Sequence, residues 1–304
     1  MNILVTGATG KFGPILIDSL LKEKHSVRAL VHNTPINIAG VESVAGSITD
    51  RESLVKACDG VDAICHLATV KGNRDSFINI NLGGLFLLLD IISKKAAPPR
   101  FILLSGDNTL PIFDYENAAP MNETHPRLFV DDEYGLSKIL EEEMAMQYAK
   151  KYNLPITILR SSWIMEDQRS VNLCHPKKGA WKSFLNEELR MRLDSGEDFR
   201  IIPYDANNKP LVRHVIDPRD LSRAFNWALT ADNISGELFN ISGAKTFDYK
   251  TLAEYLNSIE NKPTYNLILN NVHSFEIDTS KAARHGFKSI YTIYDTIKWA
   301  LGIK

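Results

Sequence analysis

Tyr134 and Lys138 are two side chains of this sequence that together could transfer a proton near neutral pH. They stand four residues apart in Tyr-Gly-Leu-Ser-Lys, so a helix would place both on one face. A lysine ammonium beside a phenol stabilises the phenolate, and the tyrosine could then act as a general acid or base. The same spacing recurs at Tyr294 and Lys298 in the C-terminal segment. That second pair is expected to have only a packing role. Position in the chain, and not spacing, therefore identifies Tyr134 and Lys138 as the candidates for proton transfer.

Three glycines near the N-terminus separate a predicted strand from a predicted helix. Gly7, Gly10 and Gly13 follow the apolar residues 3–5 and precede a segment, 14–21, that is apolar at helical period. The first glycine permits a tight turn, the second lets the backbone approach a pyrophosphate, and the third lets helix and strand pack closely. The helix N-terminus adds partial positive charge. This pattern predicts a dinucleotide site, to which the intervening residues Thr9, Lys11 and Phe12 also belong.

Other candidate cofactor contacts follow predicted strands. Strands are expected at 27–31, 41–45 and 61–67, and open parallel sheets bind ligands beyond the carboxyl ends of their strands. The residues predicted to contact the cofactor at these ends are His32, Ser47, Ile48, Leu67 and Ala68. His66 is expected to be a buried structural histidine rather than a base.

Ser105 and Asn81 are the further candidates for a catalytic role. Ser105 ends the predicted strand 100–105, at the same edge of the sheet. Asn81 lies on a helix predicted over 74–95, where its amide could hold a water or a backbone group in a proton path. The alternative is that Asn81 is an ordinary polar residue of that helix.

The end of the second predicted strand bears on the choice between NAD and NADP. A carboxylate there would hold the ribose 2′-hydroxyl of NAD, but His32 and Asn33 follow Val31. Lys11 and His32 could instead face a 2′-phosphate, or both could be solvated surface residues. We therefore predict NAD(P) as cofactor, with NADP slightly favoured.

Strands alternate with helices from residue 2 to residue 160, which predicts an α/β protein with a doubly wound parallel sheet. Residues 1–160 are predicted to form the NAD(P)-binding domain. Residues 161–304 are predicted to form a small substrate-binding lobe, interleaved with the last strands and helices of the same domain. Within 161–210 the alternation stops, and one helix is expected at 181–193. Residues 106–130 are expected to be a loop.

Composition narrows the classes of partner. The chain has 35 basic and 37 acidic residues, which gives no electrostatic case for nucleic acid. The longest apolar run, 85–89, is far shorter than the ~20 residues that span a bilayer, so no membrane segment is expected. A strand starting at residue 2 would leave no room for a signal peptide, and we expect a cytoplasmic protein.

Two further expectations concern the cysteines and the oligomeric state. Cys58, Cys65 and Cys174 lack the spacing of metal ligands, so they are expected to be buried free thiols, and no metal site is predicted. Residues 85–92 are apolar nearly all round a helix, which needs a partner on both sides. The sheet supplies one partner, and the same helix of a second subunit would supply the other, so a homodimer is predicted.

The order of these motifs resembles that of the extended short-chain dehydrogenases/reductases, the NAD-dependent epimerase/dehydratase group. The matching residues are the three glycines, His66-Leu67-Ala68, Asn81 with Gly84, Tyr134 to Lys138 with Glu142, Leu159-Arg160, His214-Val215-Ile216-Asp217, Phe239-Asn240-Ile241, and Ser280-Lys281-Ala282 with Gly286-Phe287. The resemblance implies a Rossmann-like fold. It also implies that Tyr134 exchanges the substrate's hydroxyl proton, while Lys138 tunes that tyrosine and holds the cofactor ribose.

Two departures from the family pattern bear on the substrate. Gly106 follows Ser105 where the family usually has a serine or threonine, and Asp107 comes next, near an acid of the sugar dehydratases. Pro210, beside Lys209, occupies the place of a diphosphate-binding arginine in the nucleotide-sugar enzymes, which argues against a nucleoside-diphosphate sugar. The predicted function is NAD(P)-dependent oxidation, reduction or epimerisation at a hydroxyl or carbonyl carbon of a sugar-like substrate. The alternatives are an NADP-binding sensor without catalysis and a sugar dehydratase.

Overall fold

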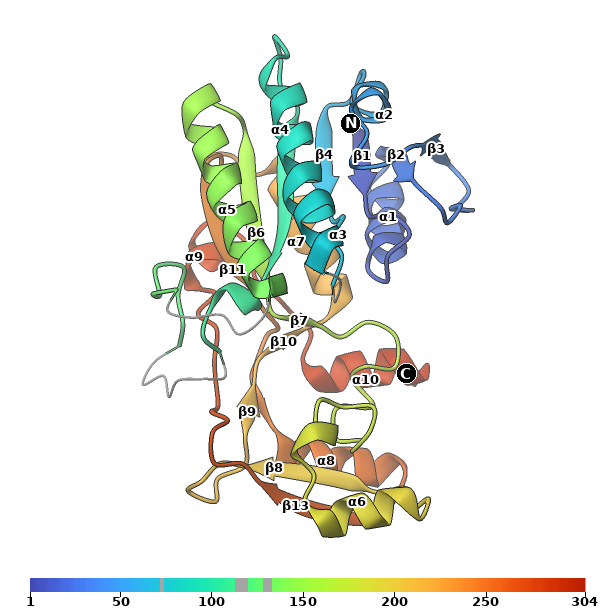
Figure 1. Ribbon diagram of the computed structural model, residues 1–304, viewed down its shortest axis with the longest axis vertical. Helices are drawn as coiled ribbons and strands as arrows, with labels where there is room; N and C mark the ends of the chain where they lie inside the picture. The colour runs from blue at the N-terminus through green and yellow to red at the C-terminus, as the bar shows by residue number, and fades with distance from the viewer. Residues whose placement is uncertain (72–73, 113–119, 128–132, 304) are drawn as a thin grey trace.

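A seven-stranded parallel sheet forms one half of the molecule in the computed structural model, which describes residues 1–71, 74–112, 120–127 and 133–303 (Figure 1). Its strands lie in the order β11-β6-β5-β4-β1-β2-β3. Their bounds are β1(Asn2–Thr6), β2(Ser26–Val31), β3(Val41–Ala45), β4(Ala63–His66), β5(Arg100–Gly106), β6(Ile156–Ser161) and β11(Glu237–Ile241). The chain builds outward from β1 on one side and from β4 on the other, so the switch point lies between these two strands. The predicted Rossmann-like α/β fold is confirmed.

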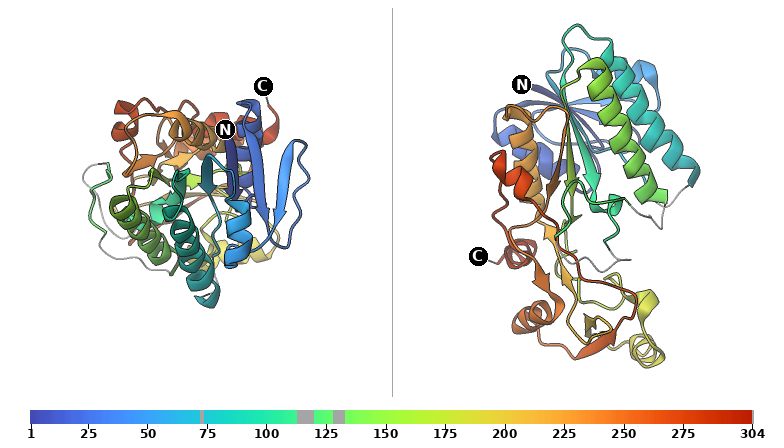
Figure 2. Two further views of the ribbon diagram at one scale, coloured as in Figure 1. Left: turned by 90° about the horizontal axis from the view of Figure 1, so that it is seen from above. Right: turned by 90° about the vertical axis from the view of Figure 1, so that its left-hand side faces the viewer.

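Helices cover both faces of this sheet (Figure 2). One face carries α1(Gly13–Lys22) and α7(Pro218–Thr230), which pack against each other. The other face carries α2(Arg51–Ala57), α4(Gly84–Ser93) and α5(Glu133–Tyr152). The central strands are therefore buried on both sides, which explains why they read as continuous apolar runs and not as alternating ones.

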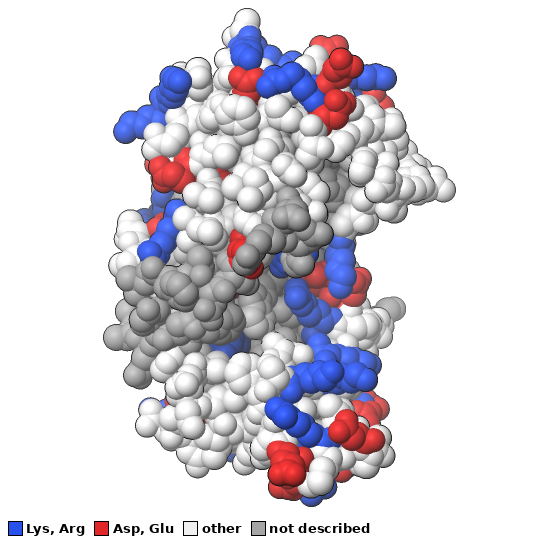
Figure 3. Space-filling model, viewed as in Figure 1, with Lys and Arg blue, Asp and Glu red and all other residues white. Residues whose placement is uncertain are grey.

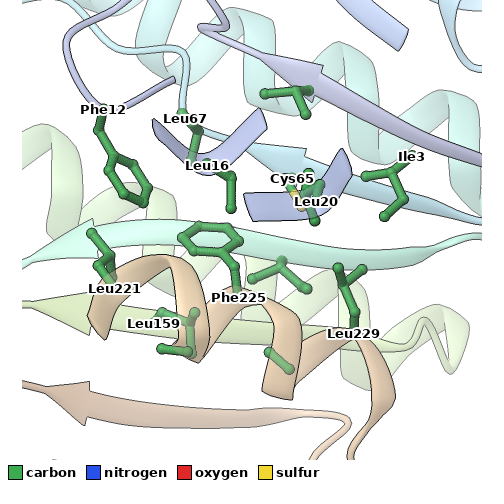
Figure 4. Close-up of a cluster of buried hydrophobic side chains, with 14 of the residues drawn as sticks. Ile3, Phe12, Leu16, Leu20, Cys65, Leu67, Leu159, Leu221, Phe225 and Leu229 are labelled. Carbon is green, nitrogen blue, oxygen red and sulfur yellow. The ribbon is translucent and has the colours of Figure 1, made fainter. Parts of the chain in front are cut away.

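The core between α1, α7 and the sheet lies directly behind the glycine turn. Figure 4 shows Phe12 and the α1 side chains Leu16 and Leu20 facing Leu221, Phe225 and Leu229 of α7 over the strands, with Ile3, Cys65 and Leu159 from the sheet and Leu67 just after β4. The rings of Phe12 and Phe225 are 5.9 Å apart. Phe12, the residue before α1, is thus fixed by α7 although the two are far apart in sequence, and this contact holds the turn in place.

Residues after β6 run between the sheet and a second group of elements with its own apolar core (Figure 1). Its strand pairs are β7(Trp163–Ile164) with β10(Val215–Ile216), β9(Val212–Arg213) with β12(Phe247–Asp248), and β8(Arg200–Tyr204) with β13(Thr264–Ile268). Its helices are α6(Glu187–Asp194), α8(Tyr249–Ile259) and α10(Ile293–Leu301), while the short α9(Ser280–Arg284) lies beside β11. No helix among the described residues is long and apolar enough to cross a membrane.

One predicted helix begins later than expected, and another is subdivided. The helix expected at 181–193 begins only at Glu187, because the side chain of Asn186 caps it by accepting the backbone N–H of Leu189. The helix expected over 74–95 comprises α3(Arg74–Phe77), a π-helical segment η1(Ile78–Gly83) and α4. The loop expected at 106–130 includes 113–119 and 128–130, which lie outside the described residues. The three cysteines are free and buried.

Candidate active site

A cavity of about 1070 Å³ opens at the carboxyl edge of the sheet, at the switch point. The structure brings the following predicted residues to its wall: Gly7, Thr9, Gly10, Lys11, Phe12, Gly13, His32, Ser47, Ile48, Leu67, Ala68, Ser105, Tyr134 and Lys138. Asn81, the remaining predicted residue, is fully buried behind the wall and is not among the lining residues. Segments more than 130 residues apart in sequence thus meet at one site.

The three glycines serve different purposes in the turn between β1 and α1. Gly7 has φ +70°, and a Cβ there would lie 2.7 Å from the backbone nitrogen of Ala68. A Cβ on Gly13 would lie 2.3 Å from the carbonyl oxygen of Ala8. At Gly10 the nearest atom to a Cβ would be the carbonyl oxygen of Gly7 at 3.2 Å, a tight contact but a less severe one than at the other two glycines. Gly7 and Gly13 are required by the fold itself, whereas Gly10 leaves space that a ligand can occupy.

His66 at the end of β4 is a buried structural residue and is not among the residues that line the cavity. Its Nδ1 lies 2.8 Å from the hydroxyl of Thr6, and the residue is buried. Burial, with a smaller effect from the charge of Lys138, lowers the pKa of His66 to about 3. The imidazole is therefore neutral at physiological pH, which agrees with a structural rather than a basic role.

Tyr134 and Lys138 lie on the first turns of α5, and both line the cavity. The Lys138 ammonium is 5.8 Å from the centre of the Tyr134 ring. Lys138 is 3% exposed, and its Nζ donates to Glu141 Oε2 at 2.7 Å and to the carbonyl oxygen of Leu104 at 3.3 Å. Tyr294, by contrast, packs against Tyr255 in the second group of elements with ring centres 4.8 Å apart. Chain position therefore distinguishes the two Tyr–Lys pairs, as expected.

Asn81 positions the loop that follows β4. Its Oδ1 accepts the backbone N–H of Val70 at 2.9 Å, and its Nδ2 donates to the carbonyl oxygen of Val70 at 3.2 Å and to Ser137 Oγ at 3.1 Å. The next residue, Lys71, places its ammonium 4.1 Å from the centre of the Tyr134 ring, on the cavity wall. Lys71 was not among the predicted site residues, since nothing in a single exposed lysine after a strand signals such a contact.

Ser105 lies at the cavity wall, but its hydroxyl is directed to a buried acid. Its Oγ donates to Glu142 Oε1 at 2.6 Å. Glu142 also accepts from Arg160 Nε at 3.0 Å and Nη2 at 2.7 Å, and from Arg127. The adjacent Gly106 has no side chain. The end of β5 therefore offers the cavity neither the hydroxyl usual in the family nor a free serine.

Asp107 is the next residue, and its carboxyl group is buried in the cavity wall. It is 2% exposed, and its Oδ2 has no hydrogen-bond partner among the described residues. Burial raises the pKa of Asp107 to about 7, against the opposing effect of the Lys71 charge. A carboxyl group of this pKa exchanges protons near neutrality. The sequence singled out Asp107 only through a family comparison, and its burial could not be foreseen.

Basic side chains outnumber acidic ones on the described cavity wall. The basic residues are Lys11, Lys71, Lys138 and Arg169, and the acidic residues are Asp107 and Glu166. In the space-filling view, lysine and arginine side chains gather along the hollow between the two halves of the molecule (Figure 3). This charge suits an anionic ligand such as a dinucleotide.

Comparison with known proteins gives consistent matches. The model of the NAD dependent epimerase/dehydratase family matches residues 3–242. The chain is 25% identical over 181 residues to L-arabinose 1-dehydrogenase (NAD(P)(+)) of Haloferax volcanii, covering 54% of this chain and 67% of that enzyme. It is 25% identical over 163 residues to uronate dehydrogenase of Pseudomonas syringae pv. tomato, covering 52% of this chain and 58% of that enzyme.

Among solved structures, a short-chain dehydrogenase/reductase superfamily protein from Agrobacterium tumefaciens with bound NAD superposes with a TM-score of 0.84. The two sequences are 25% identical, and the alignment covers 99% of this chain and 96% of that one. The family match spans the glycine turn, the cavity and the Tyr134–Lys138 pair. The chain therefore belongs to the NAD dependent epimerase/dehydratase family.

Proposed function

We propose that this protein transfers hydride between NAD(P) and a hydroxyl or carbonyl carbon of a sugar or sugar-like substrate, as a dehydrogenase or an epimerase. The observation that carries the proposal is that Tyr134, Lys138 and the glycine turn line the same cavity. The cofactor fits this wall, because Gly10 has no side chain to keep a phosphate away from the backbone at the start of α1. The named relatives that oxidise sugars add support from similarity.

Each residue of the site has a separate role in the proposed reaction. When bound, the nicotinamide supplies a hydride acceptor or donor for the reacting carbon. Tyr134 takes the hydroxyl proton in oxidation and returns it in reduction. Lys138 stabilises the phenolate by its charge and offers a donor to the cofactor ribose, while Lys71 places a second cation on the ring. Asn81 holds the loop that carries Lys71.

The buried carboxyl group of Asp107 on the cavity wall supports dehydration as a second candidate reaction. Elimination of water from a sugar needs an acid for the leaving hydroxyl, and a buried carboxyl group with pKa about 7 on the cavity wall can supply that proton. The same residue would serve a dehydrogenase by binding a substrate hydroxyl. Product analysis separates these reactions.

The test is a panel of sugars and sugar acids offered to the purified protein with NAD and with NADP. A dehydrogenase changes absorbance at the reduced-nicotinamide band. An epimerase or a dehydratase leaves that absorbance unchanged but converts the sugar, which chromatography and mass spectrometry detect. Cofactor binding without conversion of any substrate would contradict the proposal and favour a nucleotide sensor.

NADP is expected to bind at least as tightly as NAD. His32, the residue after β2, carries no negative charge, and the acids on the described wall follow β5 and β7 instead. Lys11 lies on the wall in a loose pair with Asp167 at 3.7 Å, and both side chains are exposed. A ribose 2′-phosphate could therefore recruit Lys11 at little cost.

Lys11→Glu should weaken the binding of NADP about tenfold more than the binding of NAD, because the change replaces an attraction to the 2′-phosphate by a repulsion. Calorimetric titration of both cofactors measures the ratio. Lys22→Glu, a change of the same charge at the far end of α1, is the control. Equal weakening of both cofactors, or a wild-type preference for NAD, would contradict this expectation.

We further propose a homodimer joined through α4 and α5. The helix over 84–93 is mostly covered by the protein's own core, but Phe86 is 47% exposed beside Tyr148 of α5. Leu136 and Leu140 on α5 are also more than 40% exposed. Sedimentation at micromolar concentration should give a dimer, and Phe86→Glu with Leu140→Glu should give a monomer. A monomeric wild type would rule this arrangement out.

A further inference from the structure

Two consecutive acids of α5, Glu141 and Glu142, are fully buried, yet they have different surroundings. Both oxygens of Glu142 accept hydrogen bonds, from Ser105 and from the guanidinium groups of Arg160 and Arg127. That acid is neutralised within the fold. Glu141 forms no hydrogen bond or ion pair with these arginines in the described structure, and its burial therefore needs a separate explanation.

Glu141 forms an ion pair with Lys138. Its Oε2 accepts from Lys138 Nζ at 2.7 Å, while its Oε1 is buried without a partner among the described residues. The side chains of Lys138 and Glu141 are 4% and 0% exposed. The pair is thus an ion pair withdrawn from solvent, and one of its members lines the cavity beside Tyr134.

The contacts of Lys138 fix the direction of its ammonium group. Of its three N–H donors, one is directed to Glu141 and one to the carbonyl oxygen of Leu104 on β5. Among the described residues no acceptor takes the third donor, which can therefore serve a ligand. Because Glu141 follows Lys138 by three residues on the same helix, the backbone of α5 holds the carboxylate at this place.

The charge of Glu141 is the largest of the effects that raise the pKa of Lys138. Burial is the largest single effect and lowers the pKa of Lys138, but the charge and hydrogen bond of Glu141, together with the electrostatic effects of Tyr134 and Glu142, outweigh it, and the net shift of the pKa is upward. Without the Glu141 carboxylate, only Tyr134 and Glu142 would oppose the effect of burial on Lys138. Its pKa would then fall, and the charge would be lost at a lower pH.

We propose that Glu141 is a positioning residue for the active site: it keeps Lys138 charged and directs its remaining donor toward the cofactor ribose. This rests on the proposed function, in which Lys138 serves Tyr134 and the cofactor. Glu141 acts only through Lys138 and touches neither substrate nor cofactor.

Cofactor binding tests the proposal without a known substrate. Calorimetric titrations with NAD and NADP between pH 7 and pH 10 would compare wild type with Glu141→Gln, which keeps the shape and removes the charge. Wild-type affinity should change little over this range, since Lys138 stays protonated. Glu141→Gln should match wild type within a few-fold at pH 7 and lose about tenfold by pH 10, as one charge-assisted hydrogen bond to the ribose is lost.

Two further variants show whether the effect passes through Lys138. Lys138→Met should bind the cofactors more weakly at every pH, and adding Glu141→Gln to it should change nothing more. Glu143→Gln alters the exposed neighbouring acid and should follow wild type. If Glu141→Gln does not fold, Glu141→Asp replaces it as the test, because aspartate keeps the charge. The cofactor affinity of Glu141→Asp should stay within about threefold of wild type at each pH and should not show the tenfold alkaline loss expected for glutamine.

The outcomes are distinguishable. If the affinity of Glu141→Gln follows wild type up to pH 10 while Lys138→Met is weak, the proposal for Glu141 is overturned. An alkaline loss in Glu141→Asp as large as that expected for glutamine would overturn it as well. If Lys138→Met binds both cofactors like wild type, then Lys138 does not contact the cofactor, and the assignment of the Tyr134–Lys138 site fails instead.

Discussion

Gly10→Val should abolish binding of both NAD and NADP while the protein still folds. Gly10 lacks a positive φ, and a Cβ there would have the Gly7 carbonyl oxygen as its nearest neighbour, at 3.2 Å. The valine methyl groups would then occupy the space that the pyrophosphate needs next to the backbone. We expect a loss of about 100-fold or more in affinity, equivalent to losing two hydrogen bonds to a charged group.

Calorimetric titration measures this loss, and thermal unfolding shows whether the fold is retained. Gly13→Ala provides the contrast, because its methyl group would lie 2.3 Å from the carbonyl oxygen of Ala8. That variant should unfold at a lower temperature even without cofactor. Unchanged cofactor affinity in Gly10→Val would contradict the assignment of this turn to the pyrophosphate.

The sheet could be predicted because its signals are local. Each central strand is a short apolar run followed by a turn, and β1 with Gly7 to Gly13 carries its own pattern over twelve residues. The pair of β8 and β13 gave no such signal. Arg200–Tyr204 contains Pro203, which disfavours a central strand, and its partner lies some 60 residues later in the chain. Pairing over that distance depends on the tertiary fold.

The candidate site could be predicted where chain topology alone brings residues together. Parallel strands end at one edge, so His32, Ala68 and Ser105 had to lie near the glycine turn. Side-chain direction could not be predicted in this way. The hydroxyl of Ser105 is directed to Glu142 because two arginines hold that acid in place, and these contacts join segments distant in sequence.

Burial was the second property that the sequence could not supply. Asp107 and Glu141 are ordinary acids in the sequence, but the fold removes both from water beside the Tyr134–Lys138 pair. Lys71 contacts the tyrosine ring from a loop whose preceding residue is held by Asn81. The chemistry of these three residues therefore emerges from packing.

Tyr134→Phe should lower turnover by about 10²–10⁴-fold, the usual cost of removing a general acid–base group. The change removes the phenolic oxygen and keeps the ring under the ammonium of Lys71, 4.1 Å from its centre. Binding of the cofactor should persist, because the glycine turn and Lys138 are unchanged. The measurement is kcat on the substrate found in the panel, with cofactor affinity as the control for a correctly formed site.

Ser105→Ala is the comparison that shows whether the loss is specific to the phenol. Since the Ser105 hydroxyl donates to Glu142 and Gly106 carries no hydroxyl, Ser105→Ala should reduce kcat less than Tyr134→Phe. Its principal effect should be on stability, because it leaves a buried carboxylate with one hydrogen bond fewer. If Tyr134→Phe kept near wild-type turnover, the proton would have to come from another group, and Asp107 would be the first to examine, because its buried carboxyl group also lines the cavity.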